Sequence, residues 1–274
     1  LPFFTLYSSV AVSTVELTEE CITEPIFQAD VCTYQTNHES SHTILLVHGI
    51  GDNASRDWTK QLESLRQHYR VVAVDLPGFG HSGQGDKRYT PERYVALLDF
   101  IVGHYQLSRF DLVGHSMGGA IALLYAAQHP HRVRRLVLVD VAGILHRIAL
   151  GKFVIASSLY GDRKESDKAE SYVVKVIEKF ENLFSWFRDD IAKQDEKARA
   201  GIELVDYDFS MPLEQLVTPT LLIWGSDDRI APLRTAQVLK YRIRNVNLEV
   251  IDGAGHVPMR ERSDKFNSLL MSFL

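Results

Sequence analysis

Two patterns of apolar positions alternate along most of this chain. Short apolar runs rich in β-branched residues predict strands, and longer segments with apolar residues three or four positions apart predict helices. We expect strands near residues 11–17, 27–34, 43–48, 70–75, 109–113, 133–140, 219–224 and 246–251. We expect helices near residues 55–68, 90–106, 117–129, 231–241 and 258–273. This order predicts an α/β fold in which a mostly parallel sheet, opened by an antiparallel hairpin, carries helices on both faces.

Residues 143–213 interrupt the alternation. The segment is rich in charged residues and helix formers, which predicts a helical cap inserted after the strand that ends at Asp140. The remaining residues, 1–142 and 214–274, are predicted to form the core domain. Packing between cap helices explains any single cap aromatic better, but one or two of the group are expected to contact a substrate in an apolar pocket. The candidates for contact with a substrate are Tyr160, Phe184, Trp186 and Phe187.

Composition narrows the class of protein. The 274 residues are 45% hydrophobic and 24% charged, as in ordinary globular proteins, and the formal net charge is -5. A negative charge argues against binding to nucleic acid or to an anionic membrane surface. No apolar run approaches the ~20 residues of a transmembrane helix. The sequence contains neither a cysteine–histidine metal motif nor a glycine-rich phosphate loop, so we expect no metal and no cofactor, and the oligomeric state stays open.

The first residues and the two cysteines bear on the cellular compartment. Residues 1–13 combine an apolar stretch with small residues, as parts of a signal peptide do, but no basic region precedes them, which favours a first strand or arm. Cys21 and Cys32 flank Glu24 and Pro25, a predicted turn between two strands. A disulfide there would indicate an oxidising compartment, periplasmic or secreted, whereas reduced cysteines suit the cytoplasm. The sequence favours the cytoplasm only slightly.

The segment 114–119 carries the strongest functional signal. It reads Gly-His-Ser-Met-Gly-Gly and lies between a strand-like run and a helix-like run. Gly-x-Ser-x-Gly in this context is typical of a nucleophile elbow, in which small residues let the strand and the helix close around the central serine. The hydroxyl of Ser116 then stands clear of the backbone at a helix N-terminus, which favours developing negative charge. We therefore predict Ser116 as a nucleophile, against the alternative of a chance match.

A serine nucleophile needs a base and an acid that orients the base. His256 follows a predicted strand and a glycine-containing loop, from which it can reach across the end of a sheet. Asp228 follows another buried-looking strand, and the chain order of Ser116, Asp228 and His256 fits a catalytic triad. Asp227 is the neighbouring alternative, as a turn carboxylate that caps the next helix, and Asp140 at the end of another strand is the second.

Together these motifs resemble the α/β-hydrolase superfamily, in its branch of small esterases, lipases and carbon–carbon bond hydrolases. The matching segments are residues 46–51, 75–82, 114–119, 224–228 and 253–256. The resemblance implies a sheet of about eight strands with the cap after the sixth. It also implies Asp228, four residues after Trp224, as the acid, although some hydrolases of this fold place the acid where Asp140 stands. The backbone N–H groups of Ile50 and Met117 are then the expected oxyanion hole.

The predicted function is that of a serine hydrolase that cleaves a carboxylic ester through an acyl-enzyme. A thioester or a carbon–carbon bond next to a carbonyl group is open to the same chemistry, and the sequence does not separate these substrates. A small to medium apolar acyl compound is the expected partner. Serine at the elbow argues against the aspartate chemistry of dehalogenases and epoxide hydrolases. A non-catalytic binding protein on the same fold is the alternative class, because a fold does not fix a function.

Overall fold

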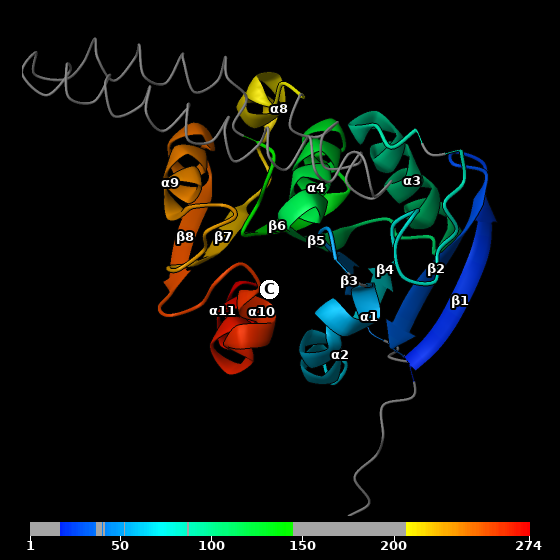
Figure 1. The fold of residues 1–274 in the computed structure, drawn as a ribbon, viewed down its shortest axis with the longest axis horizontal. Coiled ribbons are helices and arrows are strands. Elements are labelled where there is room, and N and C mark those ends of the chain that lie inside the picture. The colour runs from blue at the N-terminus through cyan, green and yellow to red at the C-terminus, as the bar shows by residue number, and fades with distance from the viewer. Residues whose placement is uncertain (1–16, 37–39, 41, 52, 87, 145–206) are drawn as a thin grey trace, which may run out of the picture.

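The computed structural model describes residues 17–36, 40, 42–51, 53–86, 88–144 and 207–274. In this part of the chain, eight strands form one sheet in the order β1-β2-β4-β3-β5-β6-β7-β8 (Figure 1). β1 pairs antiparallel with β2, which pairs antiparallel with β4, and all other neighbours are parallel. The strands are β1 (Leu17–Glu24), β2 (Ala29–Thr36), β3 (Thr43–Val47), β4 (Arg70–Val74), β5 (Phe110–His115), β6 (Val133–Val139), β7 (Thr220–Gly225) and β8 (Val246–Ile251).

The antiparallel hairpin differs in part from its prediction. The first strand begins at Leu17, where the strand expected near 11–17 was to end, and residues 11–16 lie outside the described residues. β1 is an edge strand with most of its side chains exposed or half-buried, so it lacks the apolar run that identifies a buried strand. Cys21 stands directly opposite Cys32 in the hairpin, and a disulfide joins them.

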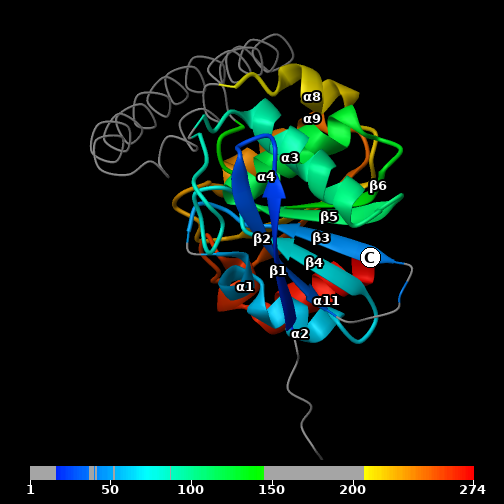
Figure 2. The same ribbon diagram turned by 90° about the vertical axis from the view of Figure 1, so that its right-hand side faces the viewer.

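Helices cover both faces of the sheet, as expected (Figures 1 and 2). The expected segments 55–68 and 258–273 each divide into two helices, at Trp58 and at Arg262, where the backbone departs from helical geometry. One face carries α3 (Pro91–His104), α4 (Ser116–Gln128), α8 (Ser210–Gln215) and α9 (Leu233–Arg242). The other carries α1 (Ala54–Asp57), α2 (Thr59–Leu65), α10 (Pro258–Glu261) and α11 (Ser263–Phe273).

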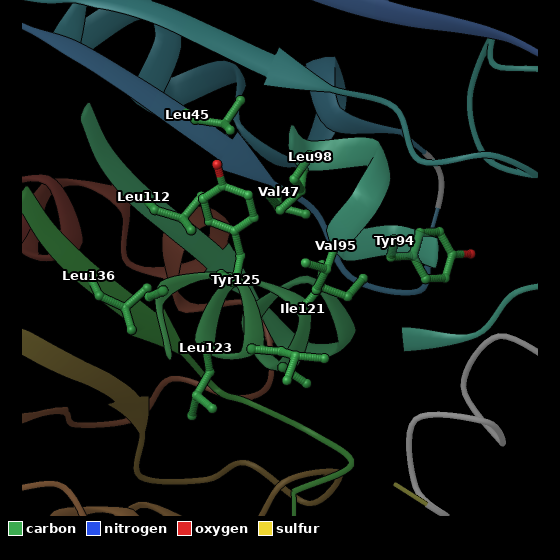
Figure 3. Close-up of a cluster of buried hydrophobic side chains, with 14 of the residues drawn as sticks. Leu45, Val47, Tyr94, Val95, Leu98, Leu112, Ile121, Leu123, Tyr125 and Leu136 are labelled. Carbon is green, nitrogen blue, oxygen red and sulfur yellow. The ribbon is translucent and has the colours of Figure 1, made fainter. Parts of the chain in front are cut away.

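The sheet separates two hydrophobic cores. Successive side chains of a strand point to opposite faces, so Leu45 and Val47 of β3 belong to the core beneath α3 and α4, while Ile44 and Leu46 belong to the core beneath α2 and α11. Figure 3 shows part of the first core, where side chains of α3 and α4 meet those of the central strands. Burial on both faces explains why the parallel strands read as continuous apolar runs.

Most of the predicted cap, residues 145–206, lies outside the described residues. The division into a core and a cap therefore stays a prediction. Within the described residues that follow, α8 packs on α4 and α9. Every helix in the described ranges is too short or too polar to cross a lipid bilayer.

Candidate active site

Ser116 lies at the junction between β5 and α4, where the backbone turns sharply. Its φ of 50° is in the left-handed region, which side chains other than glycine rarely adopt. A Cβ on Gly114 would lie 2.4 Å from the carbonyl oxygen of Gly118, and a Cβ on Gly118 would lie 2.3 Å from that of His48. Only glycine fits at both positions, so these two residues let strand and helix approach and leave Ser116 at the turn.

The structure brings Ser116, His256 and Asp228 into one chain of hydrogen bonds. Ser116 Oγ lies 2.9 Å from His256 Nε2, and His256 Nδ1 lies 2.8 Å from Asp228 Oδ2. In the neutral tautomer with the proton on Nδ1, the ring donates to the carboxylate and accepts from the hydroxyl. Asp227, the neighbouring alternative, is exposed and accepts a hydrogen bond from Ser226 Oγ instead. The strand ends of β5, β7 and β8 supply the three groups.

Asp228 is held so that its charged form is favoured. Its other oxygen, Oδ1, accepts backbone N–H groups of Ile230 and Ala231, at 2.8 and 2.9 Å. Burial alone opposes ionisation, but the hydrogen bond and the charge of His256, with the N–H of Ala231, lower the pKa of Asp228 below its ordinary value. A carboxylate in this position fixes the ring of His256 and stabilises its protonated form.

His115, the residue before Ser116, binds the backbone of His256. Its Nε2 lies 2.7 Å from the backbone carbonyl oxygen of His256, and its side chain is buried. Burial, followed by the charge of His256, lowers the pKa of His115 to about 3. His115 is therefore neutral at physiological pH and donates its Nε2–H to that carbonyl, which ties the loop after β8 to the elbow.

The loop after β3 lies directly over Ser116. His48 Nδ1–H donates to the carbonyl oxygen of Gly49 at 2.6 Å, and His48 Nε2 accepts the backbone N–H of Leu76 at 2.9 Å. A Cβ on Gly49 would lie 2.8 Å from the Cβ of Ser116, so the loop approaches the elbow as closely as glycine allows. Both nitrogens of His48 are thus used to hold the loop.

The two residues expected to form an oxyanion hole adjoin the elbow: Met117 follows Ser116 in the chain, and Ile50 follows Gly49, which lies close to Ser116. Ile50 belongs to the loop after β3, and no residue in the described ranges accepts a hydrogen bond from its backbone N–H. Met117 is the second residue of α4, and an N–H at that position has no acceptor within its own helix. The side chain of Ile50 is 41% exposed. In the described part of the chain, neither N–H group has an acceptor, as the expected oxyanion hole requires.

Asp140, the second alternative acid, is fully buried at the end of β6. Its Oδ1 accepts the backbone N–H of Gly225 at 3.0 Å. One oxygen of Asp140, one oxygen of Asp228 and a ring nitrogen of His256 lie within 4.8 Å of one another, close enough to share a metal ion. Asp228 and His256 already bind each other, however, and His256 also binds Ser116. The contacts of Asp228 and His256 are therefore those of a hydrogen-bonded triad with Ser116.

The pocket residues predicted in the cap, Tyr160, Phe184, Trp186 and Phe187, lie outside the described residues. One apolar group that the sequence analysis did not single out is Ile230, which is 58% exposed and lies two residues after Asp228.

A sequence profile described as "Alpha/beta hydrolase family" matches residues 44–269. The chain belongs to this family. The match includes the loop after β3, the elbow and the loops that carry Asp228 and His256.

Individual relatives and a solved structure agree with this assignment. A 2-hydroxy-6-oxo-2,4-heptadienoate hydrolase of Pseudomonas putida is 31% identical over 255 residues, which cover 86% of this chain and 90% of that protein. A 2-hydroxymuconate semialdehyde hydrolase of Pseudomonas sp. (strain CF600) is 27% identical, with 91% and 92% covered. The crystal structure of a membrane phospholipase A, a bacterial virulence factor, has a TM-score of 0.71 at 24% identity, covers 94% of this chain and 85% of that chain, and shows the fold alone.

Proposed function

We propose that this α/β hydrolase cleaves a carboxylic ester with Ser116 as nucleophile, His256 as base and Asp228 as orienting acid. The observation that carries the proposal is the unbroken pair of hydrogen bonds from Ser116 through His256 to Asp228. His256 Nε2 removes the hydroxyl proton as Ser116 attacks the substrate carbonyl carbon. Asp228 holds the ring with Nδ1 protonated and stabilises the imidazolium that forms.

The oxyanion that forms during attack is held by backbone donors. We assign the N–H groups of Ile50 and Met117 to this role because they adjoin the elbow and have no acceptor of their own in the described ranges. Preorganised donors stabilise the transition state because they need no reorganisation when charge develops. The close contact of Gly49 with Ser116 keeps one donor in place.

The acyl-enzyme is then hydrolysed by water. His256 protonates the leaving alcohol, which departs, and the neutral ring then accepts a proton from the attacking water. As the second tetrahedral intermediate collapses, the bond between the acyl carbon and Ser116 Oγ breaks, His256 returns the proton to Oγ, and the carboxylic acid is released. Each step uses the same hydrogen bonds, so one arrangement serves acylation and deacylation.

A second candidate reaction is the hydrolysis of a carbon–carbon bond next to a ketone. The names of the two Pseudomonas relatives carry this candidate, since one is a hydrolase of 2-hydroxy-6-oxo-2,4-heptadienoate. Cleavage beside the 6-oxo group would also pass through attack on a carbonyl carbon, so the same residues apply. A thioester is open to the same attack.

The assignment of the nucleophile is tested with a fluorophosphonate probe, which labels activated serines. The wild-type protein is expected to be labelled, and Ser116→Ala is expected to lose both labelling and ester hydrolysis, by about four orders of magnitude or more in kcat. Ser108→Ala is the matched control, because Ser108 is exposed before the other end of β5, about 20 Å from Ser116. If Ser116→Ala keeps a tenth of the turnover, the proposal is wrong.

Two substrate sets separate the candidate reactions. p-Nitrophenyl esters of increasing acyl length test ester cleavage, with short to medium chains expected to be preferred. Loss of the conjugated chromophore of 2-hydroxy-6-oxo-2,4-heptadienoate tests carbon–carbon cleavage. A protein that binds the probe substrates but turns over none of them, and that no fluorophosphonate labels, would instead be a binding protein on this fold.

A further inference from the structure

The mechanism proposed above leaves one buried ionisable group near the site without a task. Asp140 follows β6, and its φ of 41° places it, like Ser116, in the left-handed region. A strained backbone at a residue other than glycine persists only where the surrounding structure requires it, and such residues gather at functional sites. The Asp140 carboxyl group lies within 4.8 Å of a polar atom of Asp228 and of His256.

The hydrogen bonds of Asp140 are incomplete if the group carries a negative charge. Oδ1 accepts the N–H of Gly225, but Oδ2 is buried and no donor in the described part of the chain reaches it. Its neighbour Asp228 is also a carboxylate, and two carboxylates are both acceptors, so they cannot bind each other. A proton on Asp140 turns Oδ2 into a donor, and the carboxylate of Asp228 is then the acceptor that this atom needs.

We propose that Asp140 is a positioning residue, a neutral carboxylic acid that donates a hydrogen bond from Oδ2 to the carboxylate of Asp228. The role in catalysis rests on the function proposed for the triad, whereas the protonation of Asp140 does not. Asp228 then accepts two backbone N–H groups, the Nδ1–H of His256 and the O–H of Asp140. These donors restrict rotation of the carboxylate that orients the base.

The surroundings of Asp140 favour its neutral form. Burial is the largest cause, followed by the hydrogen bond to Asp228, and together with the charges of Asp228 and Glu261 they raise the pKa of Asp140 to about 10. The N–H of Gly225 acts in the opposite direction and is outweighed. His256 is the basic group of this cluster. It is hydrogen-bonded to Asp228 and lowers the pKa of Asp228, not that of Asp140.

Infrared difference spectroscopy tests the protonation state without any activity. The wild-type protein is expected to show the carbonyl stretch of a protonated carboxylic acid at pH 7, which shifts in D₂O and disappears in Asp140→Asn. Asp111→Asn is the matched control, because Asp111 is equally buried but is paired with the guanidinium of Arg134. A band that is absent from the wild type, or that remains in Asp140→Asn, overturns the proposal.

Kinetics test the positioning role. Asparagine and glycine both tolerate the left-handed backbone, but only asparagine keeps a neutral donor beside Asp228. Asp140→Asn is expected to keep kcat within about threefold of the wild type, and Asp140→Gly to lower kcat by about tenfold or more with KM little changed, since a hydrogen bond to a charged group is lost. The wild type, but not Asp140→Asn, is expected to change activity as pH approaches 10.

Two kinetic outcomes contradict the role. If Asp140→Gly equals the wild type, Asp140 does not position Asp228. If Asp140→Asn loses as much activity as Asp228→Asn, Asp140 acts as an ionised acid. If the wild type hydrolyses none of the substrates, the proposed function fails, and the infrared band still decides whether Asp140 is protonated.

Discussion

Asp227 and Asp228 are neighbours in sequence and have different surroundings. Asp228 is buried and binds His256, whereas Asp227 is exposed and binds Ser226. The side chains of two consecutive residues after a strand point in different directions, so one carboxylate at most can meet the ring. The two residues are one position apart in the chain. The spacing from Trp224 in the resembling family had indicated Asp228.

We predict that Asp228→Asn lowers kcat by about two orders of magnitude or more, because the amide favours the wrong tautomer of His256. Asp227→Asn is the matched control and is expected to stay within about twofold of the wild type. Steady-state hydrolysis of a p-nitrophenyl ester measures both. The reverse ranking would assign the acid to Asp227.

The raised pKa of Asp140 also predicts how the free energy of unfolding depends on pH. Its pKa lies near 10 in the folded protein, against an ordinary value of 3.8. The folded state therefore keeps a proton that the unfolded state releases, so this contribution to stability is complete below pH 3.8 and is lost as the pH rises to about 10. Asp140→Asn removes it. Urea unfolding at several pH values should show the variant gaining stability relative to the wild type as pH rises, and parallel curves would contradict this.

At the scale of elements, β5 and α4 form the unit that carries Ser116, the proposed nucleophile. Nearly every residue of both is buried, and glycines at 114 and 118 remove the side chains that would keep them apart. The helix begins at Ser116, so its N-terminal N–H groups lie where the proposed mechanism places negative charge. The residues that let this strand and helix pack together are therefore also those that the proposed chemistry requires.

We predict that Gly118→Ala destabilises the protein by roughly 3 kcal/mol, because its Cβ would meet the backbone oxygens of Val47 and His48 at 2.5 and 2.3 Å. Gly103→Ala in α3 is the matched control. A Cβ there meets nothing within 4 Å, so alanine should stabilise the helix by up to about 1 kcal/mol. Thermal unfolding of both variants measures the difference, and equal shifts would contradict the account.

The elements also show what sequence can and cannot predict. The strand before Ser116 and the helix after it were predictable, because buried parallel strands and apolar helices leave strong periodic signals. The strand over Leu17–Glu24 was not predicted beyond its first residue, because an exposed edge strand carries little apolar pattern. The part that Asp140 plays beside Asp228 depends on a contact between β6 and the loop after β7, which no local pattern reports. The cap, and the contact of four of its aromatics with a substrate, remain predictions.

At the scale of the whole molecule, the disulfide and the site lie far apart in the sheet. Cys21 and Cys32 join β1 to β2, and β4 and β3 separate this hairpin from β5. The bond closes a loop of sequence separation 11 at an otherwise exposed edge. Its effect should therefore fall on stability and not on chemistry.

We predict that replacing both cysteines by serine lowers the free energy of unfolding by about 3 kcal/mol, the loss expected for a short closed loop. The kcat for ester hydrolysis should stay unchanged at a temperature where both proteins are folded. Chemical denaturation with and without reductant measures the first effect, and the variant should no longer respond to reductant. A large fall in kcat would show that the hairpin shapes the site.

The distance along the chain between Ser116 and His256 has a consequence for how the protein becomes active. The hydrogen bond between them spans 140 residues, and His256, the proposed base, follows β8, the last strand in the described part of the chain. Contacts of such long separation form late, because closing a long loop costs entropy before any contact repays it. In refolding, far-ultraviolet circular dichroism should therefore recover before fluorophosphonate labelling does. In a newly made chain, the hydroxyl of Ser116 would therefore stay unactivated until the 140 residues that lead to His256 have been made and β8 has joined the sheet.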